Sequence, residues 1–311
     1  MDRFRELEAF VAVADAGSFV GAARALGLSP PAITRMVAGL EERVGSRLFN
    51  RTTRAVRLTE PGAAFVETAR RLLDDLAAAE QDVAGRQGAP TGTLSLTASM
   101  TFGRGVLAPV VSDFLAAEPQ LRVSMLLIER LVDLVDEGVD LAVRIGALPD
   151  SSLVARRVGT VRKMLVASPG YLAARGTPRA MPDLAGHAVI AFTGIVPDMR
   201  WAWREGGRAK SVPLAARFEV NDAVTAIAAA EAGQGITGVY SYMVSDALAA
   251  GRLVPVLDEF APEPVPVQFV YPQGRFLAPK VRAFLDFAVP RLERELSARH
   301  SVVTPAEAGV H

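Results

Sequence analysis

Residues 18–59 constrain the fold of this 311-residue chain more than any other stretch, and they read SFVGAARALGLSPPAITRMVAGLEERVGSRLFNRTTRAVRLT. Ser18 and Ser29 are N-cap residues for two short helices, because their hydroxyls can accept the first free backbone N–H groups. Pro30 suits a first helical position, where its missing N–H costs nothing. Gly27 suits the left-handed residue that ends a helix. These signals predict two helices separated by a tight turn.

The second of these helices has two distinct faces. Ile33, Val37 and Leu40 recur at helical spacing and form the face that packs on a core. Thr34 and Arg35 fall on the opposite side, together with two small residues, Pro31 and Ala38. The sequence therefore predicts that this second face is free to contact something outside the protein.

The segment that follows is locally basic. Residues 43–57 contain five arginines and no acidic residue, whereas the whole chain has 34 basic and 34 acidic residues and a net formal charge of zero. A basic run is often only a solvated surface, and this remains an alternative. Beside two helices of this kind, contact with phosphates is favoured, because arginine side chains neutralise them. The pattern is typical of a helix-turn-helix with a basic wing.

The segment resembles the DNA-binding domain of the LysR-type transcriptional regulators. The motifs that carry the resemblance are A-A-R-A-L-G-L-S-P-P-A-I-T-R at 22–35, L-E at 40–41, G-S-R-L-F-N-R-T-T-R at 45–54 and L-T-E-P-G at 58–62. The similarity continues more weakly along the chain. Pro30 and Met36 stand where many members carry glutamine, so the base preference of a typical member does not transfer to this chain.

The resemblance implies a winged helix-turn-helix domain over residues 1–62 that binds double-stranded DNA. It places the DNA contacts on the exposed side of the second helix and on the ribbon. The residues expected to contact DNA are Ser29, Pro30, Pro31, Thr34, Arg35, Arg51, Thr53 and Arg54.

A longer helix is expected over residues 63–86. Its apolar positions recur in steps of four and three, which is a heptad seam: Phe65, Ala69, Leu72, Leu76, Ala79 and Val83. The alternative is an ordinary amphipathic helix that packs on its own domain. The resemblance implies that this helix pairs with its counterpart in a second chain, within a homodimer or homotetramer. Residues 87–92, in a glycine-rich segment, are expected to form a hinge.

Beyond the hinge, strands and helices alternate. Strands are expected at 94–98, 121–128 and 141–145, with helices at 103–117 and 131–137 between them. This βαβαβ order predicts a parallel sheet with right-handed crossovers.

A second unit is expected to begin near residue 161. Its expected strands lie at 188–192, 201–204, 215–220 and 236–239, with a helix at 222–232. A late strand at 265–271 and a closing helix at 279–296 are expected to return to the first sheet.

The resemblance implies that residues 93–296 form an effector-binding domain of two α/β lobes, like a periplasmic binding protein. One lobe comprises residues 93–161 with 268–296, and the other comprises 162–267. The expected fold is thus multidomain, α and α/β, with residues 297–311 as a disordered tail.

A small-molecule effector is expected between the lobes, because ligands of open α/β sheets bind beyond the carboxyl ends of the strands. Ser99 and Thr101 stand at such an end and enter a helix, whose free N–H groups favour a carboxylate or phosphate. Simple helix capping by these two residues is the alternative. Arg144 suits an anionic metabolite or a bridge to Asp140. The expected effector site is Ser99, Met100, Thr101, Arg144, Phe192, Thr193 and Asn221.

Several classes of function are disfavoured. There is no cysteine, and the three histidines are far apart in sequence, so we expect no metal and no catalytic triad. Gly233–Gly238 matches G-x-G-x-x-G but follows a helix and enters a strand, which is the wrong context for a dinucleotide site. We expect no cofactor and no enzymatic activity. Lacking a secretory core or a long apolar run, the protein is expected to be cytoplasmic, with no membrane contact. An alternative is a ligand-binding or enzymatic α/β protein with an incidental helical N-terminal domain.

Overall fold

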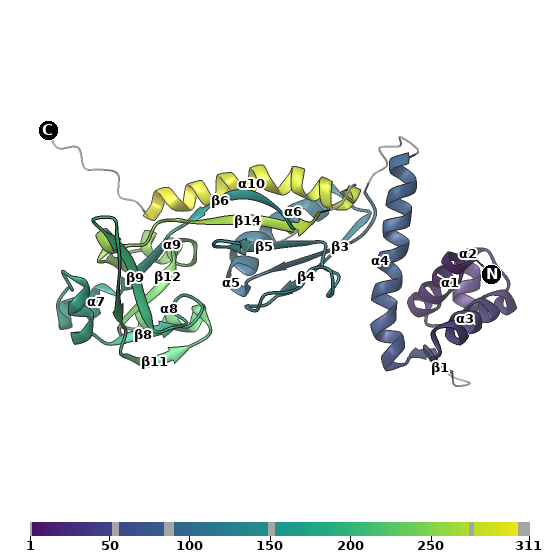
Figure 1. Ribbon diagram of the computed structural model, residues 1–311, viewed down its shortest axis with the longest axis horizontal. Helices are drawn as coiled ribbons and strands as arrows, with labels where there is room; N and C mark the ends of the chain where they lie inside the picture. Colours follow the sequence, from purple (N-terminus) through teal and green to yellow (C-terminus); the bar gives the residue numbers. More distant parts are fainter. Residues whose placement is uncertain (1, 52–55, 84–89, 149–152, 274–276, 304–311) are drawn as a thin grey trace. The chain divides into compact units, whose positions relative to one another are not determined.

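The computed structural model describes residues 2–51, 56–83, 90–148, 153–273 and 277–303 (Figure 1). The chain divides into an N-terminal unit, which extends to Thr93, and a C-terminal unit that begins at Leu94. No helix among the described residues is long and apolar enough to cross a membrane.

The N-terminal unit is helical with one small hairpin. Strands β1 and β2 pair in antiparallel fashion, with Phe49 opposite Leu58. In chain order its elements are α1 (Arg3–Ala16), α2 (Phe19–Leu26), α3 (Pro30–Val44), β1 (Phe49–Arg51), β2 (Val56–Leu58) and α4 (Glu60–Val83).

The expected caps of α2 and α3 are confirmed, whereas α4 begins at Glu60, three residues before the expected start at 63, and the expected end at 86 lies outside the described residues. The Ser18 hydroxyl accepts a hydrogen bond from Gly21 N at 3.0 Å, and the Ser29 hydroxyl accepts one from Ala32 N at 3.3 Å. Gly27 ends α2 in the left-handed region, with φ of 65°. These features depend only on residues a few positions apart, which explains why the sequence predicts them.

The core of the N-terminal unit centres on a cluster of phenylalanines. The ring of Phe10, on α1, lies 5.3 Å from that of Phe49 in the hairpin and 5.7 Å from that of Phe65 on α4. Phe10 is fully buried. The cluster therefore ties the hairpin and α4 to the same helical core.

The C-terminal unit contains two five-stranded sheets, and each sheet defines one lobe. Lobe 1 has the strand order β4-β3-β5-β14-β6, in which β3 and β5 run parallel while β14 is antiparallel to β5 and β6. Its elements are β3 (Gly92–Ala98), α5 (Met100–Phe102), a π-helical turn η1 (Gly103–Leu107), α6 (Ala108–Ala117), β4 (Leu121–Leu127), β5 (Leu141–Ile145), β6 (Leu153–Val161), β14 (Val265–Pro272) and α10 (Pro279–Val303).

Lobe 2 has the strand order β11-β8-β12-β7-β13, in which β8 is parallel to β11 and β12, and β7 is antiparallel to β12 and β13. Short 3-10 turns lie at Met181–Gly186 and Asp258–Phe260. The other elements are β7 (Lys163–Ala167), α7 (Pro169–Arg175), β8 (Val189–Phe192), β9 (Arg200–Glu205), β10 (Arg208–Pro213), β11 (Ala216–Val220), α8 (Ala223–Glu231), β12 (Ile236–Tyr240), α9 (Ser241–Ala249) and β13 (Val254–Val256).

The late strand returns to the first sheet as expected, since β14 pairs with β5 and β6. The chain thus passes between the lobes twice, once from β6 to β7 and once from β13 to β14 (Figure 1). The expected strand at 201–204 is real but lies outside the main sheet, because β9 pairs with β10 in a separate hairpin.

The helix expected at 131–137 is wrong, because residues 131–133 have no regular structure and residues 134–138 form turns. The Asp133 carboxylate accepts hydrogen bonds from Val135 N at 2.9 Å and Asp136 N at 3.0 Å. An aspartate that binds nearby backbone N–H groups in this way competes with helix formation.

The closing helix extends past its expected end at 296, to Val303. Arg299 anchors the added turn: its guanidinium donates to Glu295 at 2.7 Å and to the Tyr242 carbonyl at 3.3 Å. Residues 297–303 are therefore helical rather than a disordered tail, and residues 304–311 lie outside the described part of the chain.

Candidate functional site

The outward face of α3 carries the residues expected to read DNA. Ser29, Pro30, Pro31 and Arg35 are exposed, and Thr34 is half-buried. The Thr34 hydroxyl donates to the Pro30 carbonyl at 3.0 Å, so its proton is already used inside the helix. Arg35 forms no ion pair with any residue that the structure describes, and its five donors are available to a partner.

The hairpin is held in place by a residue to which sequence reasoning assigned no role. The Glu41 carboxylate, on the last turns of α3, accepts hydrogen bonds from Leu48 N at 2.8 Å and Phe49 N at 3.1 Å. Glu41 belongs to the L-E motif at 40–41, and that motif was the available signal. Its role is to fix where β1 leaves α3, and hence where the arginine-rich ribbon begins.

The five arginines of the basic run differ in their surroundings. Arg43 forms an ion pair with Glu6, a carboxylate of α1 that is only 5% exposed, so Arg43 serves the packing of α1 on α3. Arg47 and Arg57 are exposed. The side chain of Arg51 is not described, and Thr53 and Arg54 lie outside the described residues, so their DNA contacts stay predictions.

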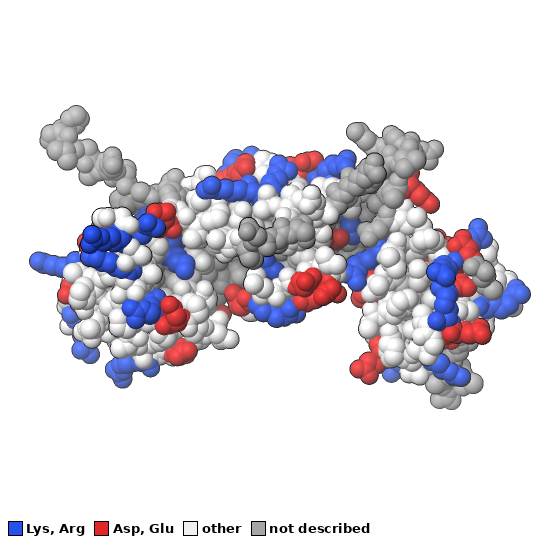
Figure 2. Space-filling view, viewed as in Figure 1, with Lys and Arg blue, Asp and Glu red and all other residues white. Residues whose placement is uncertain are grey.

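Outside the basic run, positive and negative side chains are mixed on the surface. On the described part of the face drawn in Figure 2, Lys and Arg side chains are interspersed with Asp and Glu, in keeping with the zero net charge. Affinity for a polyanion must therefore come from a local cluster such as the exposed arginines of α3 and the hairpin.

Helix α4 uses part of its expected seam inside its own domain. Ala69 is fully buried in the N-terminal core, and Phe65 packs against the same core. The alternative that the sequence left open is therefore correct for these two positions. Leu72 is 47% exposed and Leu76 is half-buried, while the side chains of Ala79 and Val83 are not described. Of the expected seam, the side chains of Leu72 and Leu76 therefore remain available for contact with a second chain.

The C-terminal unit contains a cavity of about 190 Å³ between its two lobes. It lies beyond the carboxyl ends of β5, β8 and β12, which is where open α/β sheets bind ligands. Polar side chains reach it from both lobes: Ser99, Glu129, Arg144, Tyr240 and Tyr242. Its apolar walls include Phe102, Val143, Phe192 and Met243.

The structure brings together three of the residues expected in the effector site. Ser99, Arg144 and Phe192 line the cavity. The other four expected residues, Met100, Thr101, Thr193 and Asn221, are not among the residues that line it, and their role in the site stays a prediction. Met100 and Asn221 are exposed, and Thr193 is half-buried.

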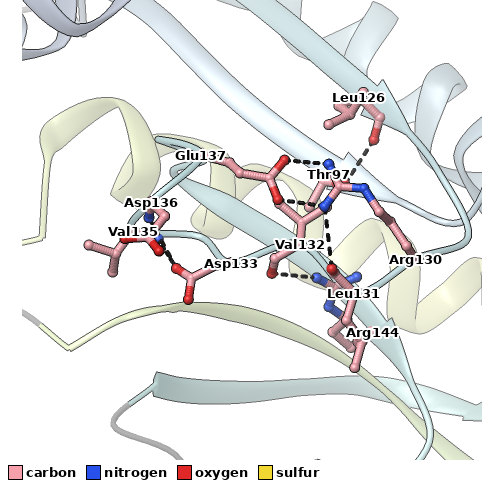
Figure 3. A network of polar contacts seen from close by, with 10 residues as sticks. All are labelled: Thr97, Leu126, Arg130, Leu131, Val132, Asp133, Val135, Asp136, Glu137 and Arg144. Atoms are coloured by element: carbon pink, nitrogen blue, oxygen red, sulfur yellow. Dashed lines mark hydrogen bonds and ion pairs between the residues drawn. The ribbon is translucent and has the colours of Figure 1, made fainter.

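Arg144 is a half-buried cation without a carboxylate partner among the described residues. Its guanidinium donates to the Val132 carbonyl at 3.1 Å, as Figure 3 shows. Burial lowers the pKa of this guanidinium, and no neighbouring charge offsets that cost. Asp140, the acid considered as its partner, instead accepts a hydrogen bond from Ser95 N at 2.8 Å.

Unlike Arg144, the neighbouring Arg130 has a carboxylate partner. It forms two hydrogen bonds of 2.6 Å with the carboxylate of Glu137, and these bonds hold the pKa of Glu137 below its usual value (Figure 3). Arg130 is therefore paired within the loop after β4, whereas Arg144 has no carboxylate partner among the described residues.

The N-terminus of α5, which was expected to bind a ligand anion, is already occupied by a carboxylate of the protein itself. Glu129 accepts a hydrogen bond from Met100 N at 2.9 Å. The Ser99 hydroxyl does not cap this helix, so the capping alternative is wrong for Ser99. The Ser99 and Tyr242 hydroxyls are both buried and lie beside each other, and neither has another hydrogen-bond partner among the described residues. Burial raises the pKa of Tyr242, which keeps its hydroxyl neutral.

Sequence reasoning missed Glu129, Tyr240 and Tyr242. A signal existed for two of them, since Glu129 follows β4 closely and Tyr240 ends β12. Gly233, the first residue of the G-x-G-x-x-G match, lies two residues after the end of α8 with φ of 76°, and β12 begins three residues later. This is the helix-to-strand context that argues against a dinucleotide site.

Two family profiles match the chain. "Bacterial regulatory helix-turn-helix protein, lysR family" matches residues 4–63, and "LysR substrate binding domain" matches residues 87–293. The chain belongs to the LysR family of transcriptional regulators. The resemblance seen in the motifs is confirmed, and this LysR-type regulator is a DNA-binding protein with a two-lobed α/β regulatory domain.

Full-length relatives share both domains. An HTH-type transcriptional regulator of Xanthomonas campestris is 36% identical, and the match covers 91% of this chain and 83% of that protein. The regulator CrgA of Neisseria meningitidis is 35% identical, with coverage of 94% and 97%. A solved structure of CrgA gives a TM-score of 0.61, covering 93% of this chain and 98% of that one. The virulence activator AphB of Vibrio cholerae gives 0.59 at 27% identity, with coverage of 93% and 99%.

Proposed function

We propose that this LysR-type regulator binds DNA as a homo-oligomer through α3 and its wing, under the control of a small molecule that places an anionic group on Arg144. The observation that supports control by an anionic small molecule is the half-buried guanidinium of Arg144 in the interlobe cavity. Its described protein partner is one neutral carbonyl. A buried cation is costly unless it is paired, and a carboxylate or phosphate supplies a charge-assisted, bidentate partner.

The cavity is built from both lobes, so a bound ligand contacts both of them. Ser99 and Arg144 come from lobe 1, and Phe192 and Tyr240 come from lobe 2. A ligand that fits one relative arrangement of the lobes better than another shifts the population toward it, whereas equal affinity for both shifts nothing. The regulatory effect therefore depends on this difference in affinity.

Arg144→Gln tests the anion site. We expect a small organic acid that raises the melting temperature of the wild type to bind this variant at least about 30-fold more weakly, because removing one partner of a buried charge pair costs roughly 2 kcal/mol or more. Thermal-shift screening of organic acids and phosphates, followed by calorimetry, measures the change. Arg157→Gln, an exposed arginine on β6, is the matched control and should bind as the wild type does. Equal binding by all three proteins would remove Arg144 from the site.

Arg35→Ala tests DNA reading. Arginine makes its most specific contacts as a bidentate donor to guanine in the major groove, and each such contact contributes about 1–3 kcal/mol of discrimination. We therefore expect the variant to lose roughly 5- to 150-fold of its preference for operator over random DNA. Gel-shift titrations on DNA that flanks the protein's own gene, at two salt concentrations, measure this preference. Arg208→Ala, an exposed arginine of the β9–β10 hairpin, is the control. Unchanged affinities for both DNAs would contradict a base-reading role.

A further inference from the structure

The charges around the interlobe cavity are of both signs. Glu129 and Arg144 both line it, yet they form no ion pair with each other, and neither has a charged partner among the described residues. Glu129 follows β4 and Arg144 lies on β5, and these two strands flank β3 in the sheet. Neighbouring strands are about 4.8 Å apart, so the two backbones are separated by roughly 10 Å. The cavity therefore has an acidic side and a basic side.

The acidic side is unsuited to a ligand anion. Glu129 already accepts the backbone N–H of Met100, the first residue of α5. A second carboxylate there would meet the negative charge of Glu129 and would find that donor occupied. A protonated amine at the same place would gain the attraction of Glu129, whose second oxygen has no partner among the described residues.

Aromatic rings and buried hydroxyls strengthen the preference for an amine. The rings of Tyr240 and Tyr242 are stacked with centroids 6.1 Å apart, and that of Phe102 lies 5.3 Å from Tyr242. Aromatic faces attract ammonium groups, and because the Lys163 ammonium already lies 5.9 Å from the centroid of the Tyr240 ring, Tyr242 and Phe102 are the rings available to a ligand. Tyr242 is only 4% exposed, and its hydroxyl lies beside that of Ser99, with no other hydrogen-bond partner for either within the described structure. Two buried hydroxyls that have only each other as partners keep unused acceptor lone pairs, and these favour a ligand that donates to them.

We propose that the cavity selects a zwitterion of amino-acid size, with its anionic group on Arg144 and its ammonium group against Glu129 and Tyr242. This inference rests on the proposed function, because it concerns the same cavity. The volume of about 190 Å³ is below the range of drug-sized pockets and suits a small amino acid or a related amino carboxylate.

Matched compounds test the proposal on the full-length protein. The probes are the protein amino acids, β-alanine and 4-aminobutanoate, each compared with the acid that lacks its amine and the amine that lacks its carboxylate. We expect at least one zwitterion to raise the melting temperature, and calorimetry to give about tenfold or weaker binding for both of its partial analogues.

Glu129→Gln supplies the matched variant, because the amide oxygen still accepts from Met100 N while the charge is lost. Its melting temperature without ligand should equal that of the wild type. We expect it to bind the zwitterion about tenfold more weakly and to bind the amine-free acid at least as well as the wild type does.

Two results would overturn the inference. One is that amine-free acids bind the wild type as tightly as the zwitterions do, through Arg144, which would leave the proposed anion site intact. The other is that no zwitterion raises the melting temperature. The organic-acid screen with Arg144→Gln decides the proposed function separately, so the two failures are distinguishable.

Discussion

Full-length protein that carries Leu72→Asp together with Leu76→Asp is expected to sediment as a monomer, whereas the wild type sediments as a dimer or larger assembly. Neither leucine belongs to the core of the N-terminal unit, although Leu73 between them packs against it, and Leu72 is 47% exposed in the single chain. In a paired helix they would be covered by the partner, and aspartates there would be buried without a counter-charge. The cost is on the order of 3 kcal/mol or more, roughly a hundredfold in the dissociation constant.

The control for this experiment is Ala77→Asp. Ala77 is exposed on the same helix but lies off the seam, so a charge there should leave the assembly intact. Analytical ultracentrifugation over a range of concentrations measures the dissociation constant of each protein. A double variant that sediments like the wild type would show that α4 does not hold the chains together.

Gly62→Ala is expected to destabilise the N-terminal unit by roughly 1–3 kcal/mol or more, through overpacking against the backbone. A Cβ at position 62 would lie 2.1 Å from the carbonyl oxygen of Leu48, and backbone cannot move aside as a flexible side chain can. The backbone N–H of Gly62 also donates a hydrogen bond to the Thr59 hydroxyl at 3.0 Å, which caps the start of α4. The added methyl must therefore push α4 away from the residue that starts the hairpin.

Gly170→Ala is the matched control, because a Cβ on this helical glycine of α7 would have no atom within 4 Å. Urea unfolding followed by circular dichroism measures stability, and gel shifts measure DNA binding. We expect Gly62→Ala to lower both, and Gly170→Ala to leave DNA binding unchanged without lowering stability, because alanine favours a helix more than glycine does. An unchanged unfolding midpoint for Gly62→Ala would mean that α4 can shift without cost.

The helix caps were predicted correctly but the packing of α4 was predicted only in part, because caps depend on neighbouring residues and helix packing depends on residues far apart in the sequence. The caps at Ser18, Gly27 and Ser29 are satisfied by neighbours within a few residues, so the sequence was sufficient to predict them. The heptad pattern of α4 identifies which side of the helix is apolar but not what covers it. Phe65 turned out to face Phe10 of its own domain, which is a tertiary contact 55 residues away.

In the α/β domain, too, the sequence predicted the elements better than the contacts that fix them. Alternating apolar runs predicted most of its strands, and the late strand was expected to return to the first sheet. The segment 131–137 is apolar enough to suggest a helix, but the Asp133 carboxylate and the Arg130–Glu137 pair hold it in turns (Figure 3). The sequence does not reveal which of these competing local bonds prevails.

The sequence by itself determined the family, the helix-turn-helix with its caps, and three cavity residues, Ser99, Arg144 and Phe192, because each follows from a motif or from a strand end. Only the tertiary structure decided how the charges of the cavity are compensated. Glu129 reaches the helix start at Met100, 29 residues earlier, while Arg144 is left without a carboxylate among the described residues. The order of the strands in the sheet decides which loops lie next to each other. Whether a buried charge has a partner depends on which residues those neighbouring loops carry, and not on how far apart the residues are along the chain.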